Sequence, residues 1–333
     1  MRFFKEFANE LEALERAVGR GAGGGFVAAA LASSVASAQD AAAETFGTKE
    51  VKDVVYKVVD GREIKLNLFL PTKADGSLAG NAPLLIDIVG GGWTSGAPGD
   101  GGFWRACGAV ERGYAVASVS HRSLEPGKLV FPAHIEDVKA AVRFLRANAT
   151  EYGIDPNRVA ATGASSGGRL ASMLGVPNKV KTFDVGDNLD QSSQVQVVVN
   201  LCCSADMAFY LETAPEQAPD PIYVALGGAK TNDKPFAEQA APLMENARRY
   251  SPITYVDADF SPTITLQGVL DHLIVPSQSC LFYEALKRAG VQTELWLDNN
   301  VGHTAAIFPM ETRKKIVFDF VEKVFGESQS AAK

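Results

Sequence analysis

Gly163-Ala164-Ser165-Ser166-Gly167 is the stretch of sequence that decides the fold. It lies between an apolar run at residues 158–162 and a segment with helical character at residues 168–174. This pattern predicts a strand, a sharp turn that carries a serine, and a helix. The glycines two residues before and after Ser165 leave room for close approach of the backbone. Ser165 is therefore the candidate nucleophile, with an ordinary Ser/Gly turn as the competing interpretation.

Strand-like and helix-like segments alternate on both sides of this turn. Two apolar runs around the dipeptide Asp60-Gly61 predict a hairpin, and short apolar runs further along are typical of strands buried on both faces. The predicted strands are residues 54–59, 64–70, 84–89, 115–119, 195–201, 263–267 and 293–297. The predicted helices lie near 103–112, after Pro132 to before Gly153, and near 233–247, 277–289 and 311–325. We expect an α/β fold: a mostly parallel central sheet with helices on both faces and an N-terminal antiparallel hairpin.

A serine nucleophile needs a base within hydrogen-bond reach, and that base needs an acid. His303 follows the strand-like run 294–298 and is the best candidate base among four histidines; His121, His134 and His272 are interpreted as surface or supporting residues. Asp271 follows the run 263–268 and is the candidate acid, with Asp298 as its rival. The order Ser165, Asp271, His303 is that of α/β-hydrolases.

The glycine-rich segment 90–92 follows the predicted strand 84–89 and suits an oxyanion hole. Consecutive glycines let main-chain N–H groups converge. We assign Gly91 and Gly92 as donors, together with the N–H of Ser166 at the start of the predicted helix. Trp93 is expected to wall the substrate pocket or to pack in the core. Phosphate binding is disfavoured because neither glycine-rich phosphate motif occurs.

Composition restricts the remaining function classes. The chain has 333 residues, 46% of them hydrophobic and 21% charged, with a formal net charge of -7, which fits a folded domain without a nucleic-acid partner. The four cysteines, at 107, 202, 203 and 280, lack the spacing of a zinc site, so neither a metal nor an organic cofactor is predicted. A disulfide from Cys202 or Cys203 to Cys280 or Cys107 stays open, as does the oligomeric state. No stretch predicts a stable membrane span.

Residues 1–38 differ from the rest of the chain. Residues 21–38 are rich in glycine and alanine and end in Ala36-Ser37-Ala38, which resembles a secretory signal with its cleavage site. We therefore predict a leader at 1–38, a linker at 39–50, one catalytic domain at 51–327 and a tail at 328–333. The predicted location is secreted or periplasmic; a cytoplasmic protein with an Ala/Gly linker is the alternative.

Several motifs together resemble the α/β-hydrolase esterases related to bifunctional feruloyl and acetylxylan esterases, and more distantly the hormone-sensitive-lipase group. They occupy residues 89–93, 131–139, 153–158, 163–168, 251–255 and 276–279. The resemblance implies a cofactor-free serine carboxylesterase that acts on small-molecule or polysaccharide-linked short-chain or aromatic acyl esters. An amidase, formamidase or peptidase of the same fold is the alternative, and a non-catalytic hydrolase-fold binding protein is a third.

The chain departs from that family pattern at three places. Val89 stands where the family usually has a histidine before the glycines, so a hydrogen bond that would brace the loop is expected to be missing. Gln267 replaces a histidine before the acid, and the spacing from Asp271 to Pro276 is one residue longer than usual. His121 replaces a tyrosine. These differences bear on substrate preference more than on mechanism, and residues 176–194 and 206–232 are expected to surround the pocket.

Overall fold

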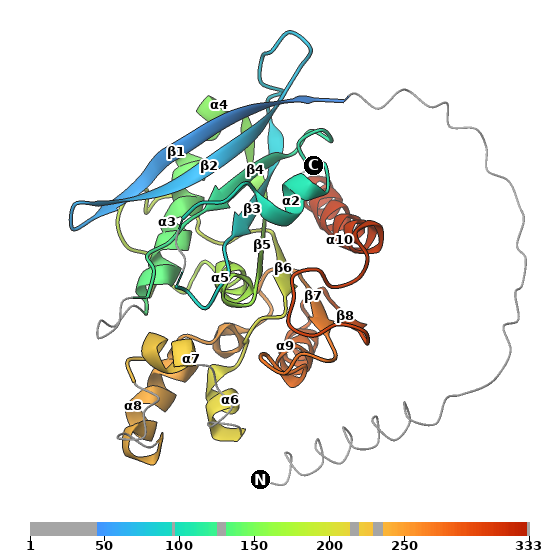
Figure 1. Ribbon diagram of the computed structural model, residues 1–333. Coiled ribbons are helices and arrows are strands. Elements are labelled where there is room, and N and C mark those ends of the chain that lie inside the picture. Colours follow the sequence, from blue (N-terminus) through green and yellow to red (C-terminus); the bar gives the residue numbers. More distant parts are fainter. Residues whose placement is uncertain (1–44, 95–96, 125–130, 214–219, 229–235, 332–333) are drawn as a thin grey trace, which may run out of the picture. The chain divides into compact units, whose positions relative to one another are not determined.

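The structure is a computed structural model that describes residues 45–94, 97–124, 131–213, 220–228 and 236–331 (Figure 1). The predicted leader at 1–38 lies outside these residues. The described residues all belong to one compact unit. Every helix in the described part of the chain is too short or too polar to span a lipid bilayer.

Eight strands form one sheet in the order β1-β2-β4-β3-β5-β6-β7-β8 (Figure 1). β1 and β2 form an antiparallel hairpin, β2 pairs antiparallel with β4, and every later pairing is parallel. The strands are β1 (Gly47–Val59), β2 (Arg62–Thr72), β3 (Ala82–Ile88), β4 (Ala115–Val119), β5 (Ile154–Ala164), β6 (Val197–Leu201), β7 (Thr263–Gly268) and β8 (Thr293–Asp298). The predicted mostly parallel sheet with an N-terminal hairpin is confirmed.

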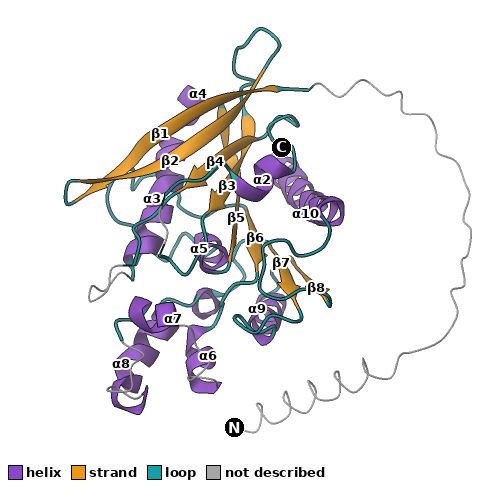
Figure 2. Cartoon of the chain, viewed as in Figure 1, coloured by secondary structure: helices purple, strands orange, loops and turns teal. Residues whose placement is uncertain are grey.

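Helices cover both faces of the sheet (Figure 2). The longer ones are α3 (Ala133–Ala147), α5 (Ser166–Leu174), α8 (Phe236–Arg249), α9 (Ser277–Arg288) and α10 (Met310–Ala331); the shorter ones are α2 (Gly102–Ala106), α4 (Ala149–Tyr152), α6 (Met207–Thr213), α7 (Asp220–Ala225) and the 3-10 helix η2 (Pro252–Tyr255). Alternate strand residues feed two hydrophobic clusters: Leu84 and Ile86 pack with α3 and α5, whereas Leu85 packs with α2 and α10. This two-sided burial explains the continuous apolar strands.

Three differences from the predicted elements are larger than a shift of a few residues in a helix or strand end. β1 begins at Gly47, inside the predicted linker, because main-chain pairing with β2 extends to an exposed segment that has no apolar alternation. The predicted helix near 103–112 is only five residues long, since Gly108 adopts a left-handed φ of 69° and ends it. Two short helices, α6 and α7, lie within 206–232, which the sequence predicts as irregular.

Two glycines allow the close packing of β3, β5 and α5 at the carboxyl edge of the sheet. A Cβ atom at Gly163 would lie 2.4 Å from the main-chain carbon of Gly167, and one at Gly167 would lie 2.2 Å from the carbonyl oxygen of Ile88. Both distances are far below van der Waals contact, and the obstructing atoms belong to the backbone. No side chain can therefore be accommodated at either position without moving the elbow.

We expect Gly163→Ala to lower the free energy of unfolding by about 3 kcal/mol or more, because the new methyl group displaces main chain rather than a flexible side chain. Urea unfolding measures the change. Gly326→Ala in α10 is the matched control: a Cβ there meets no described atom within 4 Å, and alanine at this helical position should raise stability by about 0.5–1 kcal/mol. Equal effects at the two positions would contradict the packing explanation.

Candidate active site

Ser165 occupies a strained turn between β5 and α5. Its backbone has φ 56° and ψ -122°, a conformation that residues other than glycine rarely adopt. Two main-chain hydrogen bonds hold the turn: the Ser165 N–H donates to the Leu201 carbonyl at 2.9 Å, and its carbonyl accepts the Arg169 N–H at 3.1 Å. The turn therefore anchors Ser165 between the end of β6 and the first turn of α5.

His303 and Asp271 form a hydrogen-bonded pair after β8 and β7. The distance from His303 Nδ1 to Asp271 Oδ2 is 2.7 Å, and the Asp271 side chain is fully buried. Its other oxygen, Oδ1, accepts the main-chain N–H groups of Leu273 at 2.9 Å and Ile274 at 2.8 Å. These three contacts, one from His303 and two from the carboxylate's own loop, fix the carboxylate and orient the imidazole.

The same contacts set the charge of the pair. Burial acts to raise the pKa of Asp271, but hydrogen bonds from His303 and from two main-chain N–H groups outweigh it and lower that pKa below its ordinary value. The hydrogen bond to Asp271 in turn raises the pKa of His303 well above its ordinary value, and Cys202 acts in the same direction. The arrangement thus stabilises a protonated imidazole beside an ionised carboxylate.

The rival residues have other surroundings. Asp298 accepts the N–H groups of two residues in its own loop, as an ordinary turn carboxylate does. His121 is buried and its ring nitrogens face two main-chain carbonyls. His134 is fully buried, with no hydrogen-bond partner for its ring in the described part of the chain. His272 is exposed. Of the five, only His303 lines the cavity described next.

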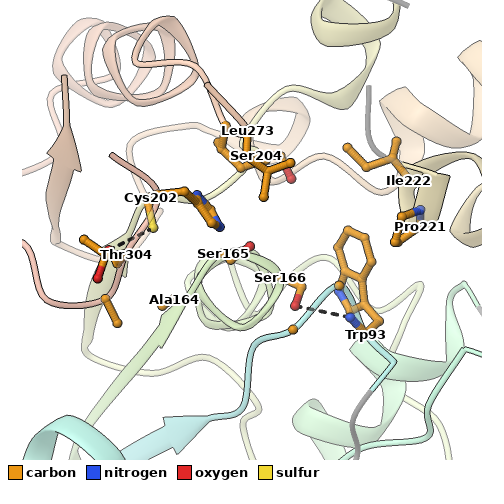
Figure 3. A pocket seen from close by; sticks show the side chains of 15 residues that line it. Trp93, Ala164, Ser165, Ser166, Cys202, Ser204, Pro221, Ile222, Leu273 and Thr304 are labelled. Atoms are coloured by element: carbon orange, nitrogen blue, oxygen red, sulfur yellow. Dashed lines mark hydrogen bonds between the residues drawn. The ribbon is translucent and has the colours of Figure 1, made fainter. Parts of the chain in front are cut away.

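A cavity of about 560 Å³ opens beside Ser165 (Figure 3). Its walls come from the ends of β3, β5, β6, β7 and β8 and from α7. The lining residues are Gly91, Gly92, Trp93, Ala164, Ser165, Ser166, Cys202, Ser204, Pro221, Ile222, Leu273, Ile274, His303, Thr304 and Ala305. All the predicted site residues except the buried Asp271 are therefore brought to one cavity, and Asp271 reaches it through His303.

Main-chain N–H groups of the cavity wall suit a developing negative charge. In the described residues, no hydrogen bond uses the N–H of Gly91, Gly92 or Ser166. The next N–H, that of Trp93, donates to the Ser166 hydroxyl at 3.3 Å and so ties the glycine loop to α5. Unpaired N–H groups that face a cavity are available to an oxyanion.

Trp93 combines the two roles that the sequence left open. It lines the cavity, yet the residue is only 3% exposed and its ring packs edge-to-face on Phe131.

The hydrogen bond that the loop was expected to lack, because Val89 stands in place of a histidine, is partly replaced by another residue. The ring Nε2 of His121 lies 3.4 Å from the Val89 carbonyl oxygen.

The loops expected to surround the pocket behave differently from one another. Pro221 and Ile222 of α7, within 206–232, line the cavity. No described residue of 176–194 does, so the prediction for this segment is wrong. Arg143 holds the segment against α3 through Asp184 at 3.1 Å and through the Asp187 carbonyl at 3.1 Å. The Asp184 carboxylate thus pairs with α3 and does not line the cavity.

Gln267 supports Asp271, a contact that the sequence showed only as a departure from the family pattern. Its side-chain Nε2 donates to Asp271 Oδ2 at 3.2 Å and to the carbonyls of Gly268 at 3.0 Å and Ile274 at 3.2 Å. Its Oε1 accepts the Ser279 hydroxyl at 2.8 Å. Gln267 therefore fixes the loop that carries Asp271, and no local sequence pattern marks this.

Replacing Gln267 by leucine should reduce kcat by tenfold to about 100-fold, because the Asp271 loop loses its internal tie and the imidazole shifts. KM should change little, since Gln267 does not line the cavity. Gln194→Leu is the control: the side chain of that glutamine makes three hydrogen bonds, against four for Gln267, and its partners do not line the cavity. Both variants should lose about 1–3 kcal/mol of stability. A normal kcat in Gln267→Leu would exclude a positioning role.

All four cysteines are free, so the disulfides that the sequence left open do not form in this structure. Cys203 is buried, and its sulfur faces the Ser172 hydroxyl at 3.8 Å. Cys202 instead lines the cavity, and its thiol donates to the Thr304 carbonyl at 3.5 Å (Figure 3). Adjacent cysteines therefore point into different environments, which their sequence positions alone do not reveal.

The chain matches one known protein family and several curated proteins along most of its length. The model of the BD-FAE family matches residues 66–286. Esterase LipQ of Mycobacterium tuberculosis is 28% identical over 82% of this chain and 62% of its own length. The probable carboxylic ester hydrolase LipM of the same organism is 28% identical over 68% of this chain and 50% of its own. The chain thus spans between half and two thirds of these curated relatives.

Two solved structures are similar to this chain over most of its length. A truncated carbohydrate esterase from gut microbiota is 26% identical, with a TM-score of 0.64 over 85% of this chain and 98% of that one. A bifunctional GH43-CE protein of Bacteroides eggerthii is 28% identical, with a TM-score of 0.65 over 86% of this chain and 39% of that one. The α/β-hydrolase fold predicted from the motifs is therefore confirmed.

Proposed function

The chain belongs to the BD-FAE family, and from this premise we propose that it is a serine carboxylesterase that acts on short-chain or aromatic acyl esters. The observation that carries the proposal is the convergence of Ser165, the Asp271–His303 pair and three unpaired main-chain N–H groups at one cavity. A nucleophile, an oriented base and oxyanion donors are the components of acyl transfer.

In the acylation half-reaction, the Ser165 hydroxyl attacks the ester carbonyl and passes its proton to His303. The carbonyl π electrons move to oxygen, and the resulting oxyanion accepts hydrogen bonds from the N–H groups of Gly91, Gly92 and Ser166. Asp271 keeps the imidazole in the required tautomer and stabilises its protonated form. The intermediate collapses as the alcohol leaves with the proton from His303, so that Ser165 retains the acyl group.

Deacylation repeats these steps with water as the nucleophile. His303 takes a proton from the water molecule, whose oxygen attacks the acyl carbonyl, and then returns the proton to the Ser165 oxygen as the acid departs. The same donors hold the second oxyanion. One set of residues therefore serves both halves of the cycle, and no further reactant than water is needed.

The cavity supports a compact acyl group. Its side-chain walls near Ser165 are largely apolar, with Trp93, Pro221, Ile222 and Leu273 among them. A volume of about 560 Å³ lies within the range of sites that enclose small molecules. The proposal extends to acetyl or feruloyl esters on plant polysaccharide, as the resemblance of the sequence motifs implies; that one structural relative is named a carbohydrate esterase supports a substrate linked to a sugar.

A substrate panel tests the proposal. We expect turnover of p-nitrophenyl acetate and butyrate, with a burst of one p-nitrophenol per enzyme if deacylation is slower than acylation. Methyl ferulate and acetylated xylan then separate aromatic acyl esters from polysaccharide acetates. Matched anilides serve as amide controls. Faster turnover of anilides than of esters would assign the site to an amidase, and the absence of all turnover would favour a non-catalytic hydrolase fold.

A further inference from the structure

Cys202 introduces a third type of ligand atom beside the Asp271–His303 pair. Its sulfur, a carboxylate oxygen of Asp271 and a ring nitrogen of His303 all lie within 4.8 Å of one another. The three residues follow three neighbouring strands, β6, β7 and β8, whose carboxyl ends meet at the cavity. The catalytic cycle proposed above uses the Asp271 carboxylate and the His303 imidazole, but it gives the Cys202 thiol no role.

The backbone holds this thiol at the cavity in a costly conformation. Cys202 has φ 45°, in the left-handed region that a residue with a side chain seldom occupies. Its N–H donates to the Leu266 carbonyl at 3.0 Å, which ties it to the end of β7. Figure 3 shows the Cys202 sulfur beside Thr304, the residue that follows His303. The position of the sulfur is thus set by the sheet edge.

We propose that Cys202, His303 and Asp271 bind a Zn²⁺ ion, and that the bound ion inhibits the enzyme reversibly. A thiolate, an imidazole nitrogen and a carboxylate oxygen are the three ligand types that proteins offer to zinc. Three protein ligands leave a fourth position for water, and the cavity that His303 and Cys202 line supplies room for it. A thiolate ligand also disfavours Mg²⁺ and Ca²⁺, which prefer oxygen.

The side chains need only small movements to coordinate the ion. A tetrahedral Zn²⁺ with ligands at about 2.0–2.3 Å separates its ligand atoms by about 3.3–3.7 Å. The Asp271–His303 contact of 2.7 Å therefore opens slightly, while the sulfur moves inward and gives up its contact with the Thr304 carbonyl. Binding releases the thiol proton, and any proton on the coordinating nitrogen, to solvent.

Inhibition follows from the role of His303, and in this respect the inference rests on the proposed function. An ion on the imidazole either takes the lone pair that accepts the serine proton or breaks the hydrogen bond to Asp271. Both outcomes remove the general base. Zinc binding itself does not depend on catalysis, so the two proposals can fail separately.

Zinc titration of the metal-free full chain tests the inhibition. We expect ZnCl₂ to inhibit p-nitrophenyl acetate hydrolysis with one ion per chain, reversibly by chelator, while MgCl₂ at the same concentration has no effect. Cys202→Ser should raise the zinc concentration for half-inhibition, relative to its own uninhibited rate, by at least about 10- to 100-fold, the range for loss of a residue that only supports a metal ligand. Cys280→Ser is the matched control, because Cys280 lies on α9 outside the cluster, and its inhibition should match the wild type.

A spectroscopic readout tests binding without activity. Co²⁺ in place of zinc should give a thiolate-to-metal charge-transfer band in the wild type, in Cys280→Ser and in Ser165→Ala, but none in Cys202→Ser. A Ser165→Ala protein that binds Co²⁺ but still hydrolyses esters would overturn the proposed function alone. Absence of the band in the wild type, or equal zinc inhibition of the wild type and Cys202→Ser, would overturn the metal site.

Discussion

Ser165→Ala is expected to lower kcat for p-nitrophenyl acetate by about 10⁵- to 10⁶-fold, which is the range for loss of a serine nucleophile. Without the hydroxyl no acyl-enzyme forms, and the residual rate reflects the oxyanion donors and substrate binding alone. Alanine keeps the Cβ atom, so the turn held by the main-chain bonds to Leu201 and Arg169 should persist. Steady-state kinetics measures the loss.

Covalent labelling separates this loss from unfolding. A fluorophosphonate probe should modify the wild type at Ser165 once per chain and leave Ser165→Ala unlabelled, while the two proteins give the same circular dichroism spectrum. Ser166→Ala provides a neighbouring control, since it keeps the main-chain N–H and the nucleophile and should still be labelled. Labelling of Ser165→Ala, or undiminished turnover by it, would show that another residue is the nucleophile.

Asp271→Asn should lower kcat by about 10⁴-fold with little change in KM. The asparagine oxygen can still accept the N–H groups of Leu273 and Ile274, which leaves the amide nitrogen facing His303 Nδ1. A donor at that point favours the tautomer with the proton on Nε2, which cannot accept the Ser165 proton. The amide also faces Nε2 of Gln267, another donor.

Asp298→Asn is the matched control, because Asp298 is also a buried carboxylate at a strand end and was the rival acid. Within the described part of the chain, its two oxygens accept only the main-chain N–H groups of Asn300 and Phe308. We expect a small loss of stability and a kcat within about threefold of the wild type, as for a turn residue that does not touch the imidazole. The reverse result, a greater loss of kcat in Asp298→Asn than in Asp271→Asn, would exchange the roles of the two acids.

The sequence predicted the proposed catalytic residues because each of them follows a strand. In a parallel sheet the carboxyl ends of the strands meet at one edge, so a serine after β5, an aspartate after β7 and a histidine after β8 are brought together by topology. Apolar strand runs and the glycine-flanked serine are local signals and can be recognised in one sequence. The roles themselves stay predictions until the variants are measured.

Contacts between distant segments could not be predicted in the same way. The support of Asp271 by Gln267 and the placement of Cys202 near His303 depend on side-chain directions at three strand ends, which no spacing encodes. The irregular segment 176–194 was expected at the pocket, but its Asp184 pairs with Lys139 and Arg143 of α3, and none of its residues lines the cavity. The short helices α6 and α7 lack the length at which helical periodicity becomes visible.

The backbone of Ser165 also has a consequence for the history of this chain. At φ 56° and ψ -122° the backbone of a glycine is less strained than that of a serine, because glycine has no Cβ atom. Ser165→Gly should therefore fold more stably than the wild type while losing activity. Selection for stability alone would replace the serine, so a descendant released from its chemical task has an easy route to glycine there. We therefore expect a relative that has lost the chemical function to carry glycine at this position more often than one that has kept it.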